Sequence, residues 1–560
     1  MSDRTPGPAD GRWWRPTGSP LSRRELLRHL GLTGVMATGV PLLGAGLEAC
    51  AVGSSTASAG ATVTCAISSE PRVLSPPTHT LAIESTVMSL LFSGLLRMTA
   101  KGGFEPDLAE SYRVSSDSMS YRFVLRKGLK WQDGRPLTSR DWKFTWRVYV
   151  NPKTRQSYVL GWDKIDRVET PDDRRIVVHM KAPYAAFLLN VATNPILPQH
   201  VLQKDFNTVP RSSFTHRPVG CGPFKLKRWQ AGVQLVLEAN PHYWRGRPLL
   251  DRFIFKVVPD VGTQLKQLHA GSVDVMSPTI TQWSQVRSMA PKIARLAYPG
   301  TTYMLVQLDE YVFLKDPRVR RALDYATPKA RIVKDVLKGL AEVAYADAPP
   351  ESPYYDPHVE RHVYDLARAA ALLGEAGFSV RNGTLTAADG RQLAVPIYTI
   401  SSSRTLLQVA RMLEQSWLEL GVKTGVHGMH GDELFGNGGP QWNGQDAALI
   451  YSWGQGPDPD DYVNWNSTQI QSNADAPGDN DGRYVNPDID RLTVQGQVEA
   501  DPVKRKQIYS QIQEILAREV PAIFLCWPRS LVAYNARLKG FRPNAYAGTF
   551  WNVNDWSISE

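Results

Sequence analysis

The sequence has few cysteines, and none of them are paired at the spacing of a metal or redox centre. Four cysteines occur in 560 residues, and no CxxC motif is among them. Neither a zinc knuckle nor a thioredoxin-type site therefore has support. The motifs GxSxG and GxxxxGKS/T are also missing, and no GxGxxG follows an expected strand. These absences leave the chain without the usual signatures of serine hydrolases, P-loop nucleotide hydrolases and dinucleotide-binding enzymes.

Dense blocks of positive charge are missing too. The formal net charge is +10, but the lysines and arginines are scattered among acids and are not interleaved with aromatic residues. A groove for single-stranded nucleic acid needs that interleaving, so we expect no nucleic-acid partner. With 42% hydrophobic and 21% charged residues, the chain has the composition of a globular protein and the length for two or more domains.

An uncharged apolar run near the N-terminus predicts a targeting segment. Arg23 and Arg24 precede a run from Leu30 to Leu47 that carries no charge, and Glu48, Ala49 and Cys50 follow it. The arginine pair resembles a twin-arginine export signal, and the letters LEAC resemble a bacterial lipobox, whose cysteine is lipidated. The alternative is an uncleaved membrane anchor, since the run approaches the roughly 20 residues that span a bilayer.

This N-terminal pattern predicts where the protein works. We expect residues 1–49 to form a twin-arginine-type export signal with a lipobox, and Cys50 to carry the lipid. Residues 50–61 are low in complexity and predict a flexible tether. The folded part is then expected at the extracytoplasmic face of a bacterial cell membrane, anchored by lipid, or in the periplasm.

The remaining cysteines, Cys65, Cys221 and Cys526, are odd in number, so at most one disulfide can form among them. Cys221 stands between glycines in PVGCGPF and could be read as an exposed nucleophile. A cysteine nucleophile needs a nearby base, and the sequence places none beside it. We therefore predict no catalytic role for Cys221.

The body of the chain mixes strand and helix patterns. SYRFVLRKGLKWQDG, VQLVLEANPHYW and RFIFKVVPD each alternate apolar and polar residues before a turn. SRDWKFTWRVYV predicts a helix capped by Ser139, and two further helices are predicted to start at Asp316-Pro317 and Asp501-Pro502. No internal repeat of solenoid length is visible. The predicted class is mixed α/β.

The segment from Leu90 to Trp146, LLFSGLLRMTAKGGFEPDLAESYRVSSDSMSYRFVLRKGLKWQDGRPLTSRDWKFTW, resembles the signature region of the extracytoplasmic solute-binding proteins of family 5. That family serves peptide-type ABC importers. Four later segments agree with the resemblance in order and spacing. They are PVGCGPFKLKRWQAGVQLVLEANPHYWRGRPLLDRFIFKVV, DPRVRRALDYATPKARIVKDVLKG, WGQGPDPDDYVNW and DPVKRKQIYSQIQEILAREVPAIFLCW.

The resemblance implies a two-lobed periplasmic-binding-protein-like fold of type II, cluster C, with an extra subdomain inserted in the first lobe. Lobe one would take residues 62–300 plus 522–560, including an inserted subdomain at about 82–200. Lobe two would take residues 301–521. Within lobe two, AVPIYTI and DAALIYSW predict buried strands, and RTLLQVARMLEQSWLELG predicts a helix with Gly421 at its C-terminal cap.

Two departures from the family bear on the ligand. The family usually has threonine where this chain has Cys221, in a loop that the resemblance places near the ligand. Peptide-binding members also carry an acid a few residues before the DP pair, where it holds the ammonium group of the peptide. Gln455 occupies that neighbourhood here. A ligand with a free N-terminal amine is therefore less firmly implied.

The run WGQGPDPDDYVNW, residues 453–465, raises the question of whether its aspartates are catalytic, metal-binding or structural. An EF-hand starting at Asp458 would need Gly and Glu where the chain has Val463 and Gln469, so calcium binding by that motif is excluded. A hydrolytic carboxylate pair stays arithmetically possible, but the prolines favour turns in which aspartates bond to nearby backbone. We expect Trp453 and Gln455 to contact a ligand and Asp458 to be mainly structural.

The function implied by the resemblance is capture of a solute, short peptides above all, between two closing lobes, and its delivery to an ABC importer. The expected ligand-binding residues are Tyr303, Trp453, Gln455, Asp458, Gly220, Cys221 and Gly222. We expect no catalysis, cofactor or metal. The expected partners are the solute, the membrane subunits of the importer, and the membrane through lipidated Cys50, with the protein itself a monomer.

A second function class is a secreted metal-dependent hydrolase. HGMHGDE places His427, His430, Asp432 and Glu433 close together, and imidazole with carboxylate suits transition metals. The spacing is not that of HExxH, and a strand would send His427 and His430 to opposite faces. Only residue types support this alternative.

Overall fold

The structure is a computed structural model that describes residues 60–154, 161–472 and 478–559. The predicted export signal, Cys50 and all of the tether except Gly60 and Ala61 lie outside these residues. The first strand of the described chain is β1 (Thr62–Ile67). Among the described residues, no helix combines the length and apolar character that a membrane span requires.

The first large sheet has the strand order β12-β21-β11-β1-β10-β9-β8. Its strands are β8 (Phe224–Gln230), β9 (Gln234–Ala239), β10 (Arg252–Val257), β11 (Val275–Met276), β12 (Ile293–Tyr298), β21 (Ser530–Asn535) and β1. β1 runs parallel to β10, β9 runs antiparallel to both β10 and β8, and Phe253 and Phe255 of β10 point into the core. The helices α5 (Val261–His269) and α6 (Ile280–Arg287) lie between β10 and β12 along the chain.

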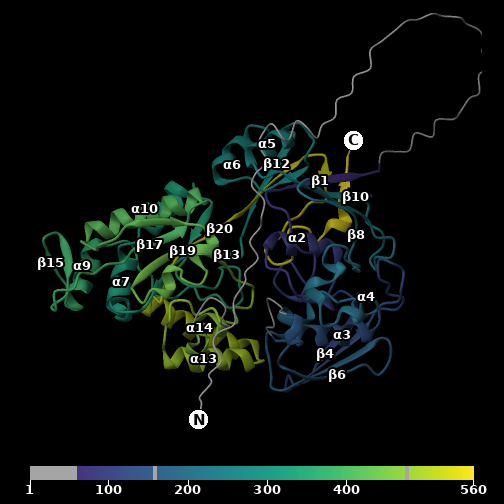
Figure 1. Cartoon of the computed structure of the whole chain (residues 1–560), viewed down its shortest axis with the longest axis horizontal. Helices are drawn as coiled ribbons and strands as arrows, with labels where there is room; N and C mark the ends of the chain where they lie inside the picture. The colour runs from purple at the N-terminus through teal and green to yellow at the C-terminus, as the bar shows by residue number, and fades with distance from the viewer. Residues whose placement is uncertain (1–59, 155–160, 473–477, 560) are drawn as a thin grey trace, which may run out of the picture. The chain divides into compact units, whose positions relative to one another are not determined.

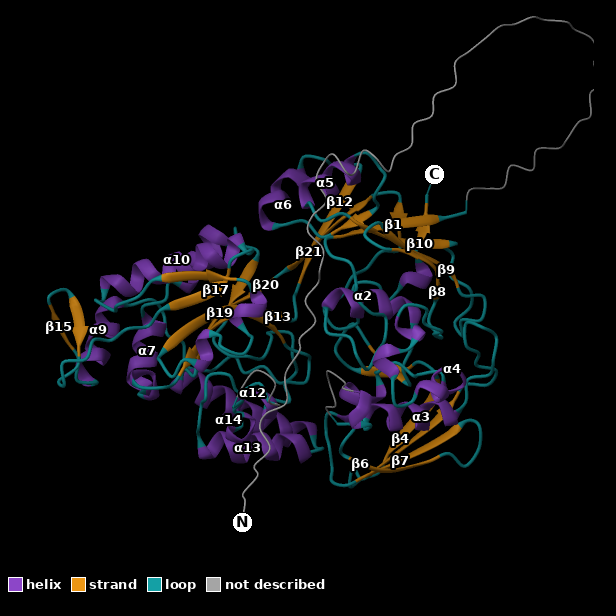
Figure 2. Cartoon of the chain, in the orientation of Figure 1, coloured by secondary structure: helices purple, strands orange, loops and turns teal. Residues whose placement is uncertain are grey.

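A smaller sheet is inserted between β1 and β8 along the chain, as expected for an extra subdomain. Its order is β4-β5-β7-β6, with β4 (Ala109–Val114), β5 (Ser120–Leu125), β6 (Ile165–Glu169) and β7 (Arg175–Met180). The same segment holds α2 (Ala82–Leu91), β2 (Leu96–Met98), β3 (Phe104–Pro106), α3 (Ser139–Tyr149) and α4 (Gln199–Leu202), and α3 packs against β7 (Figure 2).

The start of α3 differs from the prediction by one residue. Thr138, not Ser139, is the N-cap, and Asp141 Oδ2 accepts from the Thr138 backbone N at 2.8 Å. Ser139 instead donates its hydroxyl to the Asp172 carbonyl at 2.5 Å. Either residue type can cap a helix, so the sequence alone did not distinguish the two.

The second large sheet has the order β14-β20-β13-β19-β17-β18. Its strands are β13 (Thr302–Asp309), β14 (Ala341–Val343), β17 (Ile397–Ile400), β18 (Val426–Met429), β19 (Ala447–Gly454) and β20 (Ala522–Pro528). β17 and β19 confirm the two predicted buried strands. The predicted helix is α10 (Arg404–Glu419), which packs against β17 (Figure 2), and Gly421 follows its cap residue Leu420 with φ of +87°.

The second lobe also contains α7 (Pro317–Tyr325), α8 (Lys329–Arg331), α9 (Leu366–Glu375), α11 (Gly431–Leu434), α12 (Tyr462–Trp465), α13 (Pro487–Val498), α14 (Pro502–Glu519) and the hairpin of β15 (Ser379–Arg381) and β16 (Thr384–Thr386). The C-terminal segment adds β22 (Leu538–Lys539) and β23 (Ser557–Ile558). Asp316 and Asp501 cap α7 and α14 as predicted, and α13 packs against α14 (Figure 1).

The chain crosses from the first large sheet to the second and back again. The return crossing lies at a different residue from the predicted one. The first crossing lies between β12 and β13, at residues 299–301. The prediction counted residues from 522 onward with lobe one, but β20 pairs with β13 and β14 of the second sheet. β21 then pairs with β11 and β12 of the first sheet, so this crossing lies at Arg529. A buried apolar strand fits the centre of either sheet, so its composition could not show which one it joins.

The cap of α14 gives a test of this local chemistry. The Asp501 carboxylate accepts from the backbone N of Val503 and Lys504, both at 2.9 Å. We expect Asp501→Ala to lower the free energy of unfolding by about 0.5–2 kcal/mol in urea titrations, and Asp501→Asn to stay close to the wild type because asparagine also caps helices. Equal losses in both variants would contradict the capping role.

Candidate ligand-binding site

The carboxylate of Asp458 is held by a buried arginine. Arg505, which is 2% exposed, extends from α14 and forms a two-pronged ion pair with Asp458, with Nη2 at 2.7 Å from Oδ1. Its Nε also donates to the Gly496 carbonyl at 2.8 Å. A guanidinium and a carboxylate in this geometry make a strong, oriented contact. Asp458 therefore fixes the 453–465 run to α14, which is the structural role that the sequence favours for it.

Asp460 connects the same run to the first lobe. The Tyr184 hydroxyl, from the inserted subdomain, donates to Asp460 Oδ2 at 2.7 Å, and Gln497 of α13 donates to Oδ1 at 3.1 Å. Asn190 donates in turn to the Tyr184 oxygen at 2.6 Å, and the Ala185 backbone N donates to the Gln497 carbonyl at 2.8 Å. The 453–465 run is thus a hydrogen-bonded contact between the two lobes.

Asp461 forms a buried carboxyl pair with Asp347. Gln455 Nε2 donates to Asp461 Oδ1 at 3.1 Å, and Trp465 Nε1 donates to Asp347 Oδ2 at 2.7 Å. Burial raises the pKa of both carboxyls, and the charge of Asp347 raises the pKa of Asp461 further. A proton on one of the two carboxyls relieves their repulsion, and the bonds from Gln455 and Trp465 make the pair part of the scaffold of the loop.

Three of the predicted ligand contacts in the second lobe differ in exposure. Gln455 is buried, and its side chain also donates to the Pro459 carbonyl at 3.0 Å. Tyr303 is 2% exposed, with its ring packed on Trp527 at 4.9 Å between centroids. Trp453 is only partly buried and lies beside Tyr451. Trp453 therefore offers the most open side chain of the three, and their contact with a ligand stays a prediction.

The loop of Gly220, Cys221 and Gly222 packs tightly against the end of α2. A Cβ on Gly220 would lie 1.9 Å from the Leu91 carbonyl oxygen, and one on Gly222 would lie 2.6 Å from the Leu91 carbonyl carbon. Gln132 bridges the two segments, because it donates to the Leu91 carbonyl at 3.0 Å and accepts from the Gly220 N at 2.9 Å. Both glycines are needed for this close approach.

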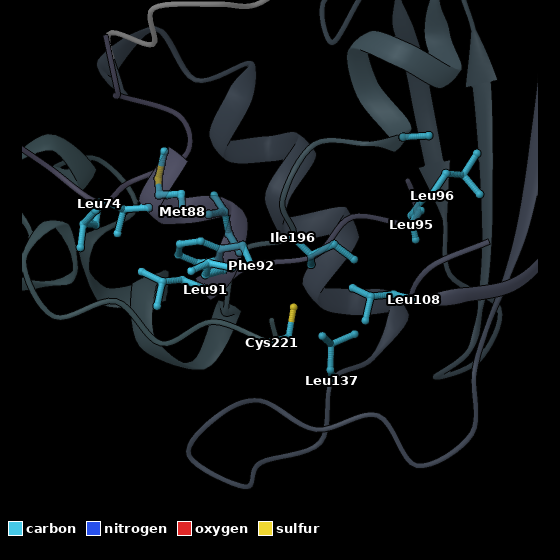
Figure 3. Packing of buried hydrophobic residues seen from close by; sticks show 14 of the residues in the cluster. Leu74, Met88, Leu91, Phe92, Leu95, Leu96, Leu108, Leu137, Ile196 and Cys221 are labelled. Atoms are coloured by element: carbon cyan, nitrogen blue, oxygen red, sulfur yellow. The ribbon is translucent and has the colours of Figure 1, made fainter. Parts of the chain in front are cut away.

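Cys221 itself is 2% exposed and lies among apolar side chains that include Leu108, Leu137 and Ile196 (Figure 3). Burial raises the pKa of its thiol, which keeps it protonated and unreactive. Cys65, Cys221 and Cys526 are all free and buried in the structure. Contact of the Gly220–Gly222 loop with a ligand stays a prediction, and the buried, protonated thiol of Cys221 gives no support to a nucleophile there.

A cavity of about 370 Å³ lies beside this loop, entirely within the first lobe. Phe92, Tyr149, Tyr243, Phe550 and Trp551 give it aromatic walls, and Ser93, Arg97, Asp107, Asn194, Arg245, Tyr546 and Asn554 supply polar groups. Ser93 and Pro223 join it to the loop, since the Ser93 carbonyl lies 3.9 Å from the Cys221 sulfur. Its composition, aromatic walls with a few polar groups, is typical of a small-molecule site.

Three of the lining residues carry buried polar atoms that have no hydrogen-bond partner within the described chain. They are Arg97 Nε, Tyr546 Oη and Asn554 Oδ1. Leaving such groups unpaired costs free energy in the solute-free structure. Asp107 adds a buried carboxylate that accepts from Trp244 Nε1 at 2.8 Å, and its burial raises its pKa to about 6. The cavity thus presents donors, acceptors and both charge signs to a solute.

Sequence reasoning did not identify this cavity. Its lining residues come from five or more segments that are distant along the chain, and each segment alone has an ordinary strand, helix or loop pattern. Asp107 and Arg97 do lie inside the quoted family signature, LLFSGLLRMTAKGGFEPDLAESY, which is the one signal that marked this part of the first lobe.

The histidine cluster does not form a metal site. His427 lies in β18 with its ring stacked on Tyr398 at 5.1 Å between centroids. His430 caps α11, accepting from the Asp432 backbone N at 3.4 Å, and its side chain is exposed. Over the described residues, no group of three His, Cys, Asp or Glu side chains is placed to hold a metal ion. The hydrolase alternative therefore has no support.

The contact between the lobes can be tested by removing one hydroxyl. We expect Tyr184→Phe to lower the free energy of unfolding by about 1–3 kcal/mol in urea titrations, because Asp460 and Asn190 both lose a buried partner. Tyr462→Phe removes an exposed hydroxyl that bonds Thr468 and serves as the matched control. The account is contradicted if the two variants lose the same amount.

The carboxyl pair predicts a pH dependence of stability. Because the folded-state pKa values of Asp347 and Asp461 lie above the ordinary value of about 3.9, the folded state binds more protons, and stability falls as pH rises above that value. We expect Asp461→Asn to make the unfolding free energy fall less between pH 4 and pH 8 than in the wild type. The exposed variant Asp432→Asn should show the pH dependence of the wild type. If the unfolding free energy of Asp461→Asn falls with pH as steeply as that of the wild type, the carboxyl pair is refuted.

Comparison with known proteins identifies the family of this chain. Residues 103–474 match the family model described as bacterial extracellular solute-binding proteins, family 5 Middle. The oligopeptide-binding protein AppA of Bacillus subtilis is 26% identical over 498 residues, covering 88% of this chain and 90% of that protein. Protein XP55 of Streptomyces lividans is 28% identical over 524 residues, covering 92% of this chain and 91% of that protein.

Solved structures show the same fold. AppA of B. subtilis in complex with a nonapeptide superposes with a TM-score of 0.78 at 26% identity, covering 90% of this chain and 99% of that one. NikZ of Campylobacter jejuni in complex with Ni(L-His) gives a TM-score of 0.78 at 27% identity, with 89% and 99% covered. With its two-lobed α/β architecture and its matching family segment, the chain belongs to the family 5 extracellular solute-binding proteins.

Proposed function

We propose that this protein captures short peptides outside the cytoplasmic membrane and delivers them, chemically unchanged, to an ABC importer. The observation that carries the proposal is the cavity of the first lobe, whose lining combines aromatic walls with polar side chains such as those of Asp107, Asn194 and Arg245. A peptide backbone supplies donors and acceptors in turn, so it can satisfy such a set. The cavity volume lies at the lower end of the usual range for ligand sites, which favours a small cargo or one end of a longer chain.

The similar proteins support this cargo without fixing it. The solved structure of AppA contains a nonapeptide, and that of NikZ contains a nickel complex of histidine. Both ligands carry carboxylate and amine groups, which match the mixture of Arg97, Arg245 and Asp107 around the cavity. A peptide held by these groups would not need an acid at position 455, where this chain has glutamine.

We assign the predicted site residues different tasks within this function. Trp453 provides the open aromatic wall of the second lobe, while Tyr303, Gln455 and Asp458 hold the loop that carries it. Gly220, Cys221 and Gly222 shape the cavity by bringing the loop close to α2. The two lobes, divided near residue 300 and again near Arg529, close on the solute.

The remaining parts of the proposal concern location and partners. The export signal, lipidated Cys50 and the tether would keep the protein at the outer face of the cytoplasmic membrane, where a monomer passes its solute to the membrane subunits of the importer. Membership in an extracellular solute-binding family supports this placement. Buried, protonated Cys221 and the separated histidines give no support to catalysis.

A cavity-filling variant tests the proposal. Ser89 is exposed on α2 and lines the cavity, so Ser89→Trp places an indole in the site without disturbing the core. We expect it to weaken binding of peptides from an enzymatic casein digest at least about tenfold, or about 1.4 kcal/mol, in calorimetry and thermal-shift titrations. Ala82→Trp, exposed on the same helix but outside the cavity lining, is the matched control.

The proposal fails if the wild-type protein shows no thermal shift with the digest after its bound material is removed. The assignment of the cavity fails separately if Ser89→Trp and Ala82→Trp bind peptides equally well.

A further inference from the structure

A second and larger recess, of about 930 Å³, lies on the first lobe and shares no lining residue with the ligand cavity. We call it the basic groove. Its described lining residues are Glu70, Pro71, Arg72, His216, Arg217, Pro218, Leu226, Lys227, Arg228, Trp229 and Ala231. They come from the segment after β1, the segment before the 220–222 loop, and the end of β8. None of the functional assignments above uses this surface.

The groove carries an excess of positive charge. Arg72, Arg217 and Arg228 are exposed, and within the described chain none of their guanidinium groups forms an ion pair. Glu70 is the only acid among the described residues of the lining, and both of its oxygens are occupied. They accept from Trp229 Nε1 at 2.6 Å and from the Gly232 backbone N at 2.9 Å. Three unpaired guanidinium groups therefore face a recess whose one carboxylate is already engaged.

The walls of the groove suit a polypeptide better than a membrane surface. The His216 ring stacks on the Trp229 indole at 5.1 Å between centroids with an angle of 24°, and Pro71 and Pro218 are buried beneath the rim. A bilayer surface is flat, so it would not fill a recess lined by stacked rings. An extended peptide segment can enter it, stack on apolar rings and pair its carboxylates with arginines.

The location of the groove also points to a protein partner. β8 runs parallel to β1, because β10 is parallel to β1 and β9 is antiparallel to both β10 and β8. Glu70 and Trp229 therefore lie near the C-terminal ends of these two parallel strands. Thr62, where the chain enters β1, lies at the opposite end. Pro218 also lies two residues before Gly220, so a partner in the groove would contact the segment that leads into the wall of the ligand cavity.

We propose that the basic groove is a docking site for an acidic segment of the importer's membrane subunit. The proposal rests on the proposed function, since it assumes that an importer receives the solute. Arginines pair with aspartate and glutamate side chains through two parallel hydrogen bonds, and complementary charge speeds the encounter of two proteins. Docking here would bring the solute-loaded lobe to the importer by electrostatic attraction.

The experiment uses the full-length, membrane-anchored protein in its native host. The double variant Arg217→Glu/Arg228→Glu should reduce uptake of a labelled tripeptide at least about tenfold, through loss of electrostatic complementarity. Its binding of the casein digest should stay within about twofold of the wild type. Lys504→Glu/Lys506→Glu on exposed positions of α14 changes the net charge equally and should leave uptake unchanged.

A cross-link identifies the occupant. A photoreactive p-benzoylphenylalanine in place of exposed Ala231, which lines the groove, should cross-link to a polypeptide that mass spectrometry identifies as the importer's transmembrane subunit. Normal uptake by the arginine double variant, or cross-links to phospholipid alone, would overturn the proposal. Absence of peptide binding by the wild type would instead overturn the proposed function. The cross-link is measured without peptide binding, so the two failures can be distinguished.

Discussion

The buried ion pair between Asp458 and Arg505 is the contact on which the link between the lobes depends. It ties the loop after β19 to α14, and the next residues of that loop, Asp460 and Asp461, then meet fixed partners. A buried charge without its partner is costly, so each member of the pair requires the other. With Asp458 committed in this way, its carboxylate serves as a structural anchor for the 453–465 run.

The same division between scaffold and site appears in the first lobe. Gly220 and Gly222 let the loop approach α2, and Cys221 fills an apolar space behind it. A cavity lies beside the loop, and its lining includes the polar residues Arg97, Tyr546 and Asn554. Core packing therefore creates the shape of the site, and residues from other segments supply its chemistry. A binding protein needs only this arrangement, because its ligand leaves chemically unchanged.

Local chemistry explains which features the sequence could predict. Asp316 and Asp501 cap helices through bonds to residues two or three positions ahead, and the apolar composition of β17 and β19 matches their burial. The misplaced features depend on distant partners. β20 joins the second sheet because of its pairing with β13, a choice that its own residues do not encode.

The candidate site also depends on partners that are distant along the chain, so the sequence predicted it only in part. The pattern WGQGPDPDDYVNW predicted turn-forming aspartates, but it could not show that Asp458 would meet an arginine of a later helix or that Gln455 would turn inward. The family signature marked the region of Asp107 and Arg97, while Tyr546 and Asn554 came from a segment with no recognisable motif. Ligand contacts are assembled from several segments, so a single sequence shows them only where a family motif covers them.

The central claim, that this protein holds peptides in the first-lobe cavity, is tested most directly by native mass spectrometry of the protein purified from its own host. The account predicts a set of bound masses that fragmentation identifies as short peptides and that dissociate on mild denaturation. A single non-peptide compound would keep solute capture but contradict the peptide cargo. A protein without any bound solute that also fails to take up added peptides would contradict the account as a whole.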